Sequence, residues 1–193
     1  TTSAINTVGA NLIILGIAYY ADAPAPTITD TGSNIWTLSG SSGVSGYGRA
    51  RFAYCYNPVT NANHTFTLNR ILTLPTICVA AFSGSDSAPL DQENGNTASG
   101  VTSLSTGSIT PSEGDELLVS FVTHFEDDGT GGFPVSINES FIQTDDIDLT
   151  GNHWGGSFAY LIQTAAAAKN PTWDFSSQTK SAAAARIVFH WME

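Results

Sequence analysis

The stretch GANLIILGIAYY at residues 9–20 returns in altered form as GDELLVSFVTHF at residues 114–125. The spacing between matched segments stays at about 105 to 110 residues along the chain. The other matched segments are 52–54 with 158–160, 63–66 with 170–173, and 77–79 with 187–189. Similarity at a steady spacing indicates internal duplication. The sequence therefore predicts two copies of one β-rich unit, over about residues 9–83 and 114–192.

Both matched stretches contain a run that is apolar on successive positions, at residues 12–20 and, apart from Ser120 and His124, at residues 117–125. A strand without a polar face is covered on both sides, whereas an alternating strand is half exposed. We therefore expect these two segments to be central strands of a shared core. Further segments with strand composition, bounded by Gly, Pro, Asn or Asp, are 26–30, 34–39, 49–57, 63–69, 76–83, 100–109, 135–143, 156–164, 171–175 and 185–192.

Helical signals are weak in this chain. Residues 164–169 and 181–185 are rich in alanine, which favours helix, but the second run leads into β-branched and aromatic residues. We expect one helical turn at most, at the first run. Many short strands without helices predict an all-β fold, an antiparallel β-sandwich with jelly-roll-like character, built from two pseudo-symmetric halves in one domain over residues 1–193.

Charge excludes one class of partner. The chain has 193 residues and a net charge of -11, from 17 acids and 6 bases, and the bases are scattered. Nucleic-acid binding needs clustered bases, so we expect no nucleic-acid partner. The longest apolar run, residues 12–20, is shorter than the roughly 20 residues that span a bilayer, and no basic segment precedes it. We expect neither membrane insertion nor a signal peptide.

The two cysteines are expected to be packing residues. In the repeat, Cys55 corresponds to Leu161 and Cys78 to Val188, and free cysteine behaves as a small buried apolar residue. A disulfide between neighbouring strands is the alternative.

A polar segment, Asp30-Thr31-Gly32-Ser33-Asn34, joins two strand segments. Asp, Asn and Gly favour tight turns, so we interpret it as a hairpin turn. The alternative is a calcium loop that uses Asp30, Asn34 and backbone carbonyls. Calcium loops carry more acids and a closing Glu, and both are missing here.

Two acidic segments, residues 126–128 and 145–148, are expected to be solvated loops that keep the chain soluble. The alternative is that divalent cations bridge the acids of the two segments, which include Asp145, Asp146 and Asp148. A pair of carboxylates could also hydrolyse a glycosidic bond, which is the residual enzymatic hypothesis.

Trp154 follows Asn152 and His153 beside the second acidic segment. A loop tryptophan could stack on a sugar ring while nearby polar groups bind its hydroxyls. The alternative is a tryptophan folded back over the edge of the sandwich. The other tryptophans, Trp36, Trp173 and Trp191, lie in strand patterns and are expected in the core.

Nothing in the sequence has the spacing of a catalytic or metal-binding motif. The four histidines share no metal spacing, and no Gly-x-Ser-x-Gly motif or Cys–His neighbourhood is present. Three histidines, His64, His124 and His190, align with Pro171, Tyr19 and Ala80, so they look positional. We expect a protein that is not an enzyme and has no cofactor.

The phrases GANLIILGIAYYA, TDTGSNIWTL, FSGSDSAPLDQ and TPSEGDELLVSFVTHF together resemble β-sandwich surface modules of bacteriophage structural proteins and of bacterial secreted or cell-surface proteins. The family pattern has Gly directly before Asn in its turn, whereas here Ser33 separates Gly32 from Asn34. The resemblance implies a sandwich fold and carries no catalytic residues.

Three functions are compatible with these observations. The resemblance and an apparently self-contained acidic chain favour a non-catalytic virion or cell-surface protein, such as a capsid decoration or tail-fibre protein, with capsid proteins or further copies as partners. The second function is a carbohydrate-binding module that binds glycans through Trp154, Asn152 and the acids at 145–148. The third is a carboxylate-based glycoside hydrolase. The first two imply a location on a virion, on a cell surface or outside the cell.

Overall fold

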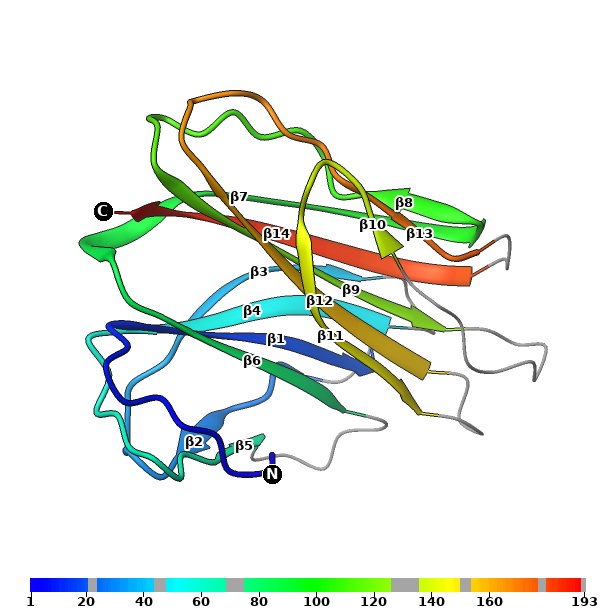
Figure 1. Ribbon diagram of the computed structural model, residues 1–193. Helices are drawn as coiled ribbons and strands as arrows, with labels where there is room; N and C mark the ends of the chain where they lie inside the picture. Colours follow the sequence, from blue (N-terminus) through cyan, green and yellow to red (C-terminus); the bar gives the residue numbers. More distant parts are fainter. Residues whose placement is uncertain are drawn as a thin grey trace.

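The computed structural model describes residues 1–20, 24–43, 48–68, 75–125, 136–149, 154–176 and 180–191. Within these ranges every regular element is a β-strand, and the paired strands are antiparallel (Figure 1). The all-β prediction is confirmed. Residues 164–169, where one helical turn at most was expected, form a bend followed by extended chain. The described residues contain no helix long and apolar enough to cross a membrane.

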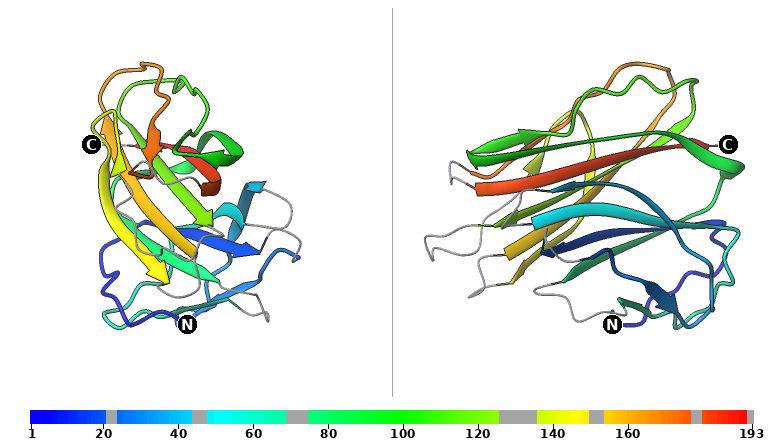
Figure 2. Two further views of the ribbon diagram at one scale, coloured as in Figure 1. Left: turned by 90° about the vertical axis from the view of Figure 1, so that its right-hand side faces the viewer. Right: turned by 180° about the vertical axis from the view of Figure 1, so that it is seen from behind.

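Two large sheets pack against each other (Figures 1 and 2). The first sheet has the order β3 (Thr37–Gly43), β4 (Gly48–Tyr56), β1 (Leu12–Tyr20), β6 (Thr76–Phe82). The second sheet has the order β11 (Ile142–Leu149), β12 (Trp154–Gln163), β9 (Glu116–Phe125), β14 (Lys180–Trp191), β7 (Ser85–Val101). One apolar cluster draws its side chains from both sheets, so the architecture is that of a β-sandwich.

Each large sheet also carries a small sheet on its outer face. A second apolar cluster joins the outer face of β1 to β2 (Ile28–Asp30) and β5 (Phe66–Leu68). A third cluster joins the outer face of β9 to β8 (Ser103–Ser105), β10 (Ser136–Ile137) and β13 (Thr172–Asp174). The two central strands are therefore buried on both faces, which confirms the expectation drawn from their largely apolar runs.

Strand order repeats between the halves. In the first sheet the third, fourth, first and sixth strands of the chain lie side by side in that order, as β3-β4-β1-β6. Counted from β9, the third, fourth, first and sixth strands lie in the same order in the second sheet, as β11-β12-β9-β14. Pairing agrees as well, because Gly16 lies opposite Phe52 while Phe121 lies opposite Phe158. That the halves superimpose by a rotation remains a prediction.

The register corrects one matched segment of the repeat. Cys78 pairs with Gly16 in the first sheet, and Ala185 pairs with Phe121 in the second. The structural counterpart of Cys78 is therefore Ala185 and not Val188, so residues 77–79 were matched three positions too far along β14. The error arose because an Ile-Val-Phe run looks like a better sequence match than a run of alanines.

The connections differ from those of a jelly roll. Jelly rolls are built from Greek keys, in which three consecutive strands lie in order beside one another. Here β4 lies between β3 and β1, and each half keeps its four main strands in one sheet. The sandwich is thus present without jelly-roll connectivity.

Three strand boundaries also differ from expectation. Residues 85–101 form the long edge strand β7, although the segment is polar and contains Pro89, which an edge strand tolerates. The acidic segment 145–148 belongs to strand β11 instead of a loop. Strand β14 begins at Lys180 and includes the alanine run, because its neighbours β9 and β7 supply backbone partners on both sides.

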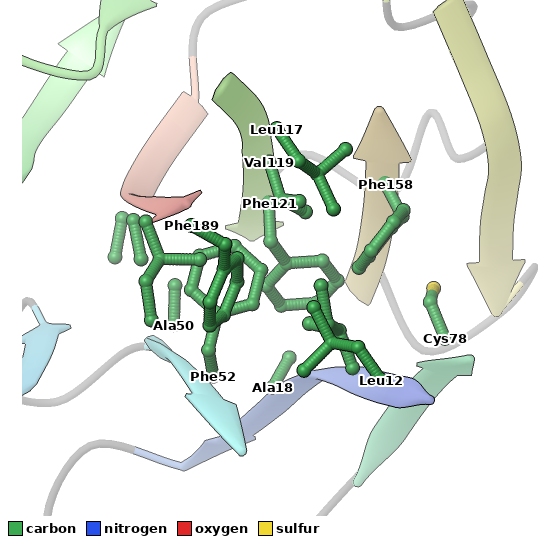
Figure 3. Close-up of a cluster of buried hydrophobic side chains, with 14 of the residues drawn as sticks. Leu12, Ala18, Ala50, Phe52, Cys78, Leu117, Val119, Phe121, Phe158 and Phe189 are labelled. Carbon is green, nitrogen blue, oxygen red and sulfur yellow. The ribbon is translucent and has the colours of Figure 1, made fainter. Parts of the chain in front are cut away.

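Aromatic side chains join the two large sheets. Phe52 of β4 makes edge-to-face contacts with Phe121 and Phe158, at ring-centroid distances of 6.3 and 6.2 Å. Tyr54 packs against Phe189 in the same way at 5.2 Å. Figure 3 shows the labelled phenylalanine rings pointing toward one another between the sheets. Such pairs stabilise by about 0.5–1.5 kcal/mol each beyond the area that they bury.

Gly16 makes room for this packing at the middle of β1. A Cβ at this position would lie 2.5 Å from Phe121 Cδ2 and 2.9 Å from Phe158 Cδ2. Both distances are shorter than a normal carbon–carbon contact, so the glycine lets the sheets approach around the Phe121 ring.

Both cysteines are free and buried, which confirms the predicted thiols. Cys78 belongs to the core between the sheets, where burial first, and then the charges of Asp145 and Asp146, raise the pKa of its thiol. Cys55 lies on β4 and Cys78 on β6, and β1 separates these strands, so the two thiols are not on neighbouring strands.

We predict that Gly16→Ala lowers the free energy of unfolding by about 1–3 kcal/mol, because the new methyl group overpacks the core. Phe121→Leu removes the ring that the methyl group would strike. The double variant should therefore be more stable than the sum of the two single losses implies. Urea denaturation of the four proteins measures this coupling, and strictly additive losses would contradict the proposed contact.

Candidate functional site

The predicted sugar-stacking residue Trp154 lies in the interior. It begins β12, is 1% exposed, and packs at 6.1 Å from the ring of Phe125. On its other side the indole lies against Gly48, where an added Cβ would meet its ring at 2.8 Å. The ring faces are covered by protein, so Trp154 would have to leave this packing to stack on a sugar. Its position corresponds to the alternative of a tryptophan folded back into the sandwich.

Asp145 and Asp146 of β11 do not form a carboxylate pair. Asp145 pairs with Phe158, whose ring faces the core between the sheets, while Asp146 pairs with Ser157. Directly opposed residues share a face and successive residues point to opposite faces. Asp145 and Asp146 therefore lie on opposite sides of the sheet, and Asp146 accepts a hydrogen bond from Ser157 Oγ at 2.7 Å. Two carboxylates on opposite faces cannot flank one glycosidic bond.

Other members of the predicted site lie outside the described residues. These are Asn152, His153 and the acidic segment 126–128. For Asp148 only the backbone is described, and it pairs with Gly155.

Asp30 ends β2 and organises the following turn. Its Oδ1 accepts hydrogen bonds from the backbone N–H of Gly32 at 2.6 Å and from Asn34 Nδ2 at 3.1 Å. Its Oδ2 accepts from Trp36 Nε1 at 2.7 Å. The turn prediction is thus correct, but the turn is not a hairpin, because β2 pairs with β5 and the chain continues into the other sheet.

Asn34 fastens this turn to the next loop. Its side chain accepts from the backbone N–H of Val59 at 2.7 Å and donates to the carbonyl of Val59 at 3.1 Å. Both halves of the Asn34 amide therefore serve the fold. A calcium ion at this turn would compete with these donors for the oxygens of Asp30 and Asn34.

A buried histidine extends the network of Asp30. His64 Nε2 lies 3.0 Å from Asp30 Oδ1, and His64 Nδ1 lies 2.9 Å from Thr7 Oγ1. In a neutral ring, Nε2–H donates to Asp30 and Nδ1 accepts the hydroxyl proton of Thr7. The His64 ring also stacks on Phe66 at a centroid distance of 4.4 Å.

Hydroxyl, imidazole and carboxylate in this order are the components of a hydrolase triad. The network differs from a catalytic triad because a substrate cannot reach it: Thr7 is 1% exposed and His64 is 0% exposed. The Thr7 oxygen also accepts a hydrogen bond from the backbone N–H of Asn61 at 3.2 Å. A nucleophile needs an open side for the reacting carbon, and Thr7 has none, so the group is a structural network.

The charge of Asp30 is stabilised by this network. Burial raises the pKa of Asp30, but hydrogen bonds from His64, Trp36, Asn34 and Gly32 outweigh it and hold the pKa below its usual value. The carboxylate therefore stays ionised inside the protein, where it joins three segments of chain.

Sequence reasoning missed a second polar cluster. His190, interpreted as positional, lies against Glu113 and Glu116, with Nδ1 at 3.0 and 2.9 Å from their carboxylate oxygens. Sequence spacing could not indicate it, because His190 is more than 70 residues from both acids. The cluster forms only because β9 and β14 pair with Glu116 opposite His190.

We predict that Asp30→Asn lowers the free energy of unfolding at pH 7 by about 1–3 kcal/mol, because buried donors lose a charged acceptor. A folded-state pKa below the unfolded value of about 3.9 gives stability that is present above that pH. It is lost as the pH falls through the folded-state pKa, so the variant should lose less stability between pH 5 and pH 2 than the native chain does. Urea midpoints across this range measure the difference.

Asp174→Asn is the matched control, since Asp174 is exposed and accepts a backbone hydrogen bond from Ser176. Equal effects of the two substitutions on the pH dependence would contradict the role assigned to Asp30.

Comparison of the chain with known proteins gives no match from which a function could be inferred. No protein-family model, curated protein or solved structure matches this chain. The geometry described above therefore has to support any functional conclusion by itself.

Proposed function

We propose that this chain is a non-catalytic structural protein of a virion or cell surface, such as a capsid decoration or tail-fibre protein. The observation that carries the proposal is the sealed state of the Thr7–His64–Asp30 network. Within the described residues it has the components of a catalytic triad, and all three side chains are enclosed by the fold. Its polar atoms bind loops together, as suits a rigid assembly component.

Exposed apolar side chains stand on the loops that this network holds. Val8, Ile35 and Val59 are 66%, 89% and 63% exposed. The loops that carry them are neighbours, because Val59 is hydrogen-bonded to Asn34, which precedes Ile35, and Asn61 is hydrogen-bonded to Thr7, which precedes Val8. We call these three residues the apolar tip. Fixed, solvent-exposed apolar groups are typical of protein contact surfaces.

The partner that fits this tip is another protein subunit of the assembly. The tip itself carries no charge, while the whole chain has 17 acids and 6 bases. A polyanion would be repelled by this balance, whereas a neutral or basic protein surface with an apolar centre would be attracted. The acidic surface would also limit uncontrolled aggregation of free copies.

We predict that Ile35→Asp combined with Val59→Asp weakens attachment to capsids or envelopes from the source by at least about tenfold, because burial of two apolar side chains is lost. Co-sedimentation of the purified chain with such particles measures attachment. Ile142→Asp is the control, since Ile142 is 55% exposed but lies on β11. A chain that stays monomeric and binds no particles would overturn the proposal.

A carbohydrate-binding module remains a second candidate because of one polar hollow. It has a volume of about 260 Å³ and lies between the edge strands β3 and β7. Its lining includes Ser39, Gly40, Ser42, Glu93, Asn94 and Gly95. Both carboxylate oxygens of Glu93 accept from the Gly40 N–H at 3.1 Å, which fixes an acceptor group where sugar hydroxyls could bind.

For this second candidate, a glycan array with the native chain is the direct measurement. Binding should fall about tenfold in Glu93→Ala, which removes the carboxylate that lines the hollow. An array without any signal removes the candidate, and it leaves the structural proposal intact.

A further inference from the structure

A cluster of two glutamates and a histidine lies at one end of the second sheet. Glu116 is the first residue of β9, His190 is next to last in β14, and Glu113 belongs to the loop before β9. One ligand atom from each side chain can be chosen so that all three lie within 4.8 Å of one another. The cluster is separate from the apolar tip and from the Thr7–His64–Asp30 network.

Strand pairing determines the geometry. Glu116 lies directly opposite His190 on one side and opposite Gln163 of β12 on the other. Directly opposed residues share one face of a sheet, so the three side chains stand in a row across β12, β9 and β14. The loop that supplies Glu113 is held by Asp91, whose Oδ2 accepts from the Ser112 N–H at 2.9 Å.

A buried oxygen in this row has no partner. The side chain of Glu116 is 0% exposed, and its Oε1 lies 2.9 Å from His190 Nδ1. The second oxygen of the same carboxylate, Oε2, is buried and has no hydrogen-bond partner among the described residues. The neighbouring Gln163 Oε1 is in the same condition, because the Gln163 amide nitrogen donates to the carbonyls of Ala165 and Ala167.

An unpartnered buried carboxylate oxygen is costly, about 1–3 kcal/mol or more. The buried, unpartnered oxygen of Glu116 therefore indicates that a positive group belongs beside it. A structural role alone would be served as well by an apolar pair, which would avoid this cost.

The surplus of carboxyl groups around His190 also favours a bound cation. The carboxyl groups of Asp91, Glu113 and Glu116 all lie close to His190, the one histidine of the cluster. The cluster thus has more carboxylates than a single imidazolium can neutralise.

The ligand types select the kind of ion. Magnesium and calcium prefer all-oxygen sites, whereas imidazole with carboxylates suits zinc and its neighbours in the first transition row. Around a tetrahedral zinc ion with bonds of about 2.1 Å, ligand atoms lie about 3.4 Å apart. The contacts from His190 to the two glutamates, at 3.0 and 2.9 Å, need to open by only a few tenths of an ångström.

We propose that Glu113, Glu116 and His190 form a binding site for one divalent transition-metal ion of the zinc class. Three protein ligands leave a fourth position for water on the side of Glu113, whose side chain is 62% exposed. The ion would tie the end of β14 to the start of β9 and to the loop before it. It would thereby stabilise the folded chain in proportion to its free concentration.

The test uses the full chain after treatment with a chelator. Isothermal titration calorimetry with zinc chloride should show one equivalent bound, and thermal unfolding should shift to higher temperature with added zinc. Magnesium chloride at the same concentration should produce neither effect. Absence of zinc binding, or equal responses to zinc and magnesium, overturns the proposal.

Substitutions locate the site. Glu113→Gln, His190→Gln and Glu116→Gln should each weaken zinc binding by at least about tenfold, and circular dichroism before titration shows whether each variant folds. Glu113 is the most informative position, because an exposed side chain can be changed without disturbing the core. Asp146→Asn, which removes one exposed acid on β11, should leave zinc binding unchanged. Equal affinities in Glu113→Gln and Asp146→Asn would overturn the assignment.

A proton is the competing explanation for the unpartnered oxygen. If Glu116 carries a proton on Oε2, then Glu116→Gln replaces it with a neutral donor of similar shape. The native chain would then bind no zinc, and the variant would unfold at the same temperature or higher, with zinc and without. That pair of results would also overturn the metal site.

Discussion

The close approach of two sheets around Phe121 is the constraint on which the rest of the structure depends. Phe121 projects from the centre of β9 onto Gly16 at the centre of β1, and Phe52 closes the contact from the side. These positions correspond in the two halves, since Gly16 pairs with Phe52 as Phe121 pairs with Phe158. One half therefore supplies the gap and the other supplies the ring. Two glycines would leave a cavity here and two rings would clash, so tight packing requires a small residue on one strand and a ring on the other.

The same central strands explain the outer layers. Their second faces are buried as well, so each large sheet needs a cover, and short strands with long connections provide it. A cover made mostly of loop has few backbone partners of its own, and side chains replace them. Asp30, Asn34 and His64 do so over the first sheet, while Gln92, Asn94 and Asn96 of β7 each donate to a carbonyl of the 105–110 segment. Polar side chains that resemble parts of a catalytic site therefore mainly hold the covering loops in place.

This division explains what could be predicted from sequence. Largely apolar runs identified β1 and β9 and their burial on both faces, because hydrophobic pattern and burial are directly linked. Strand β7 was not predicted because its sequence has no apolar pattern. Its polar side chains bond to the 105–110 segment, and its backbone pairs with β14. Trp154 was expected near the surface because its neighbours are polar, yet Gly48 of the opposite sheet receives its ring. The cluster of Glu113, Glu116 and His190 arises from strand register alone, which sequence spacing does not reveal.

The two surfaces with proposed roles lie at the same end of the sandwich. The ring of Tyr54 contacts the ring of Phe189. Tyr54 is paired with Ile14 near the start of β1, and Phe189 is paired with Leu117 near the start of β9, so the contact brings these two strand ends together. Asn11, just before β1, exchanges two hydrogen bonds with the backbone of Ser85, which is paired with Trp191 beside His190. A continuous set of bonds thus runs from the loops of the apolar tip to the end of β14. An ion that fixes the end of β14 would act on the same structural unit that presents the tip, so a rigid contact surface and a metal-stabilised strand end are mutually consistent features of one molecule.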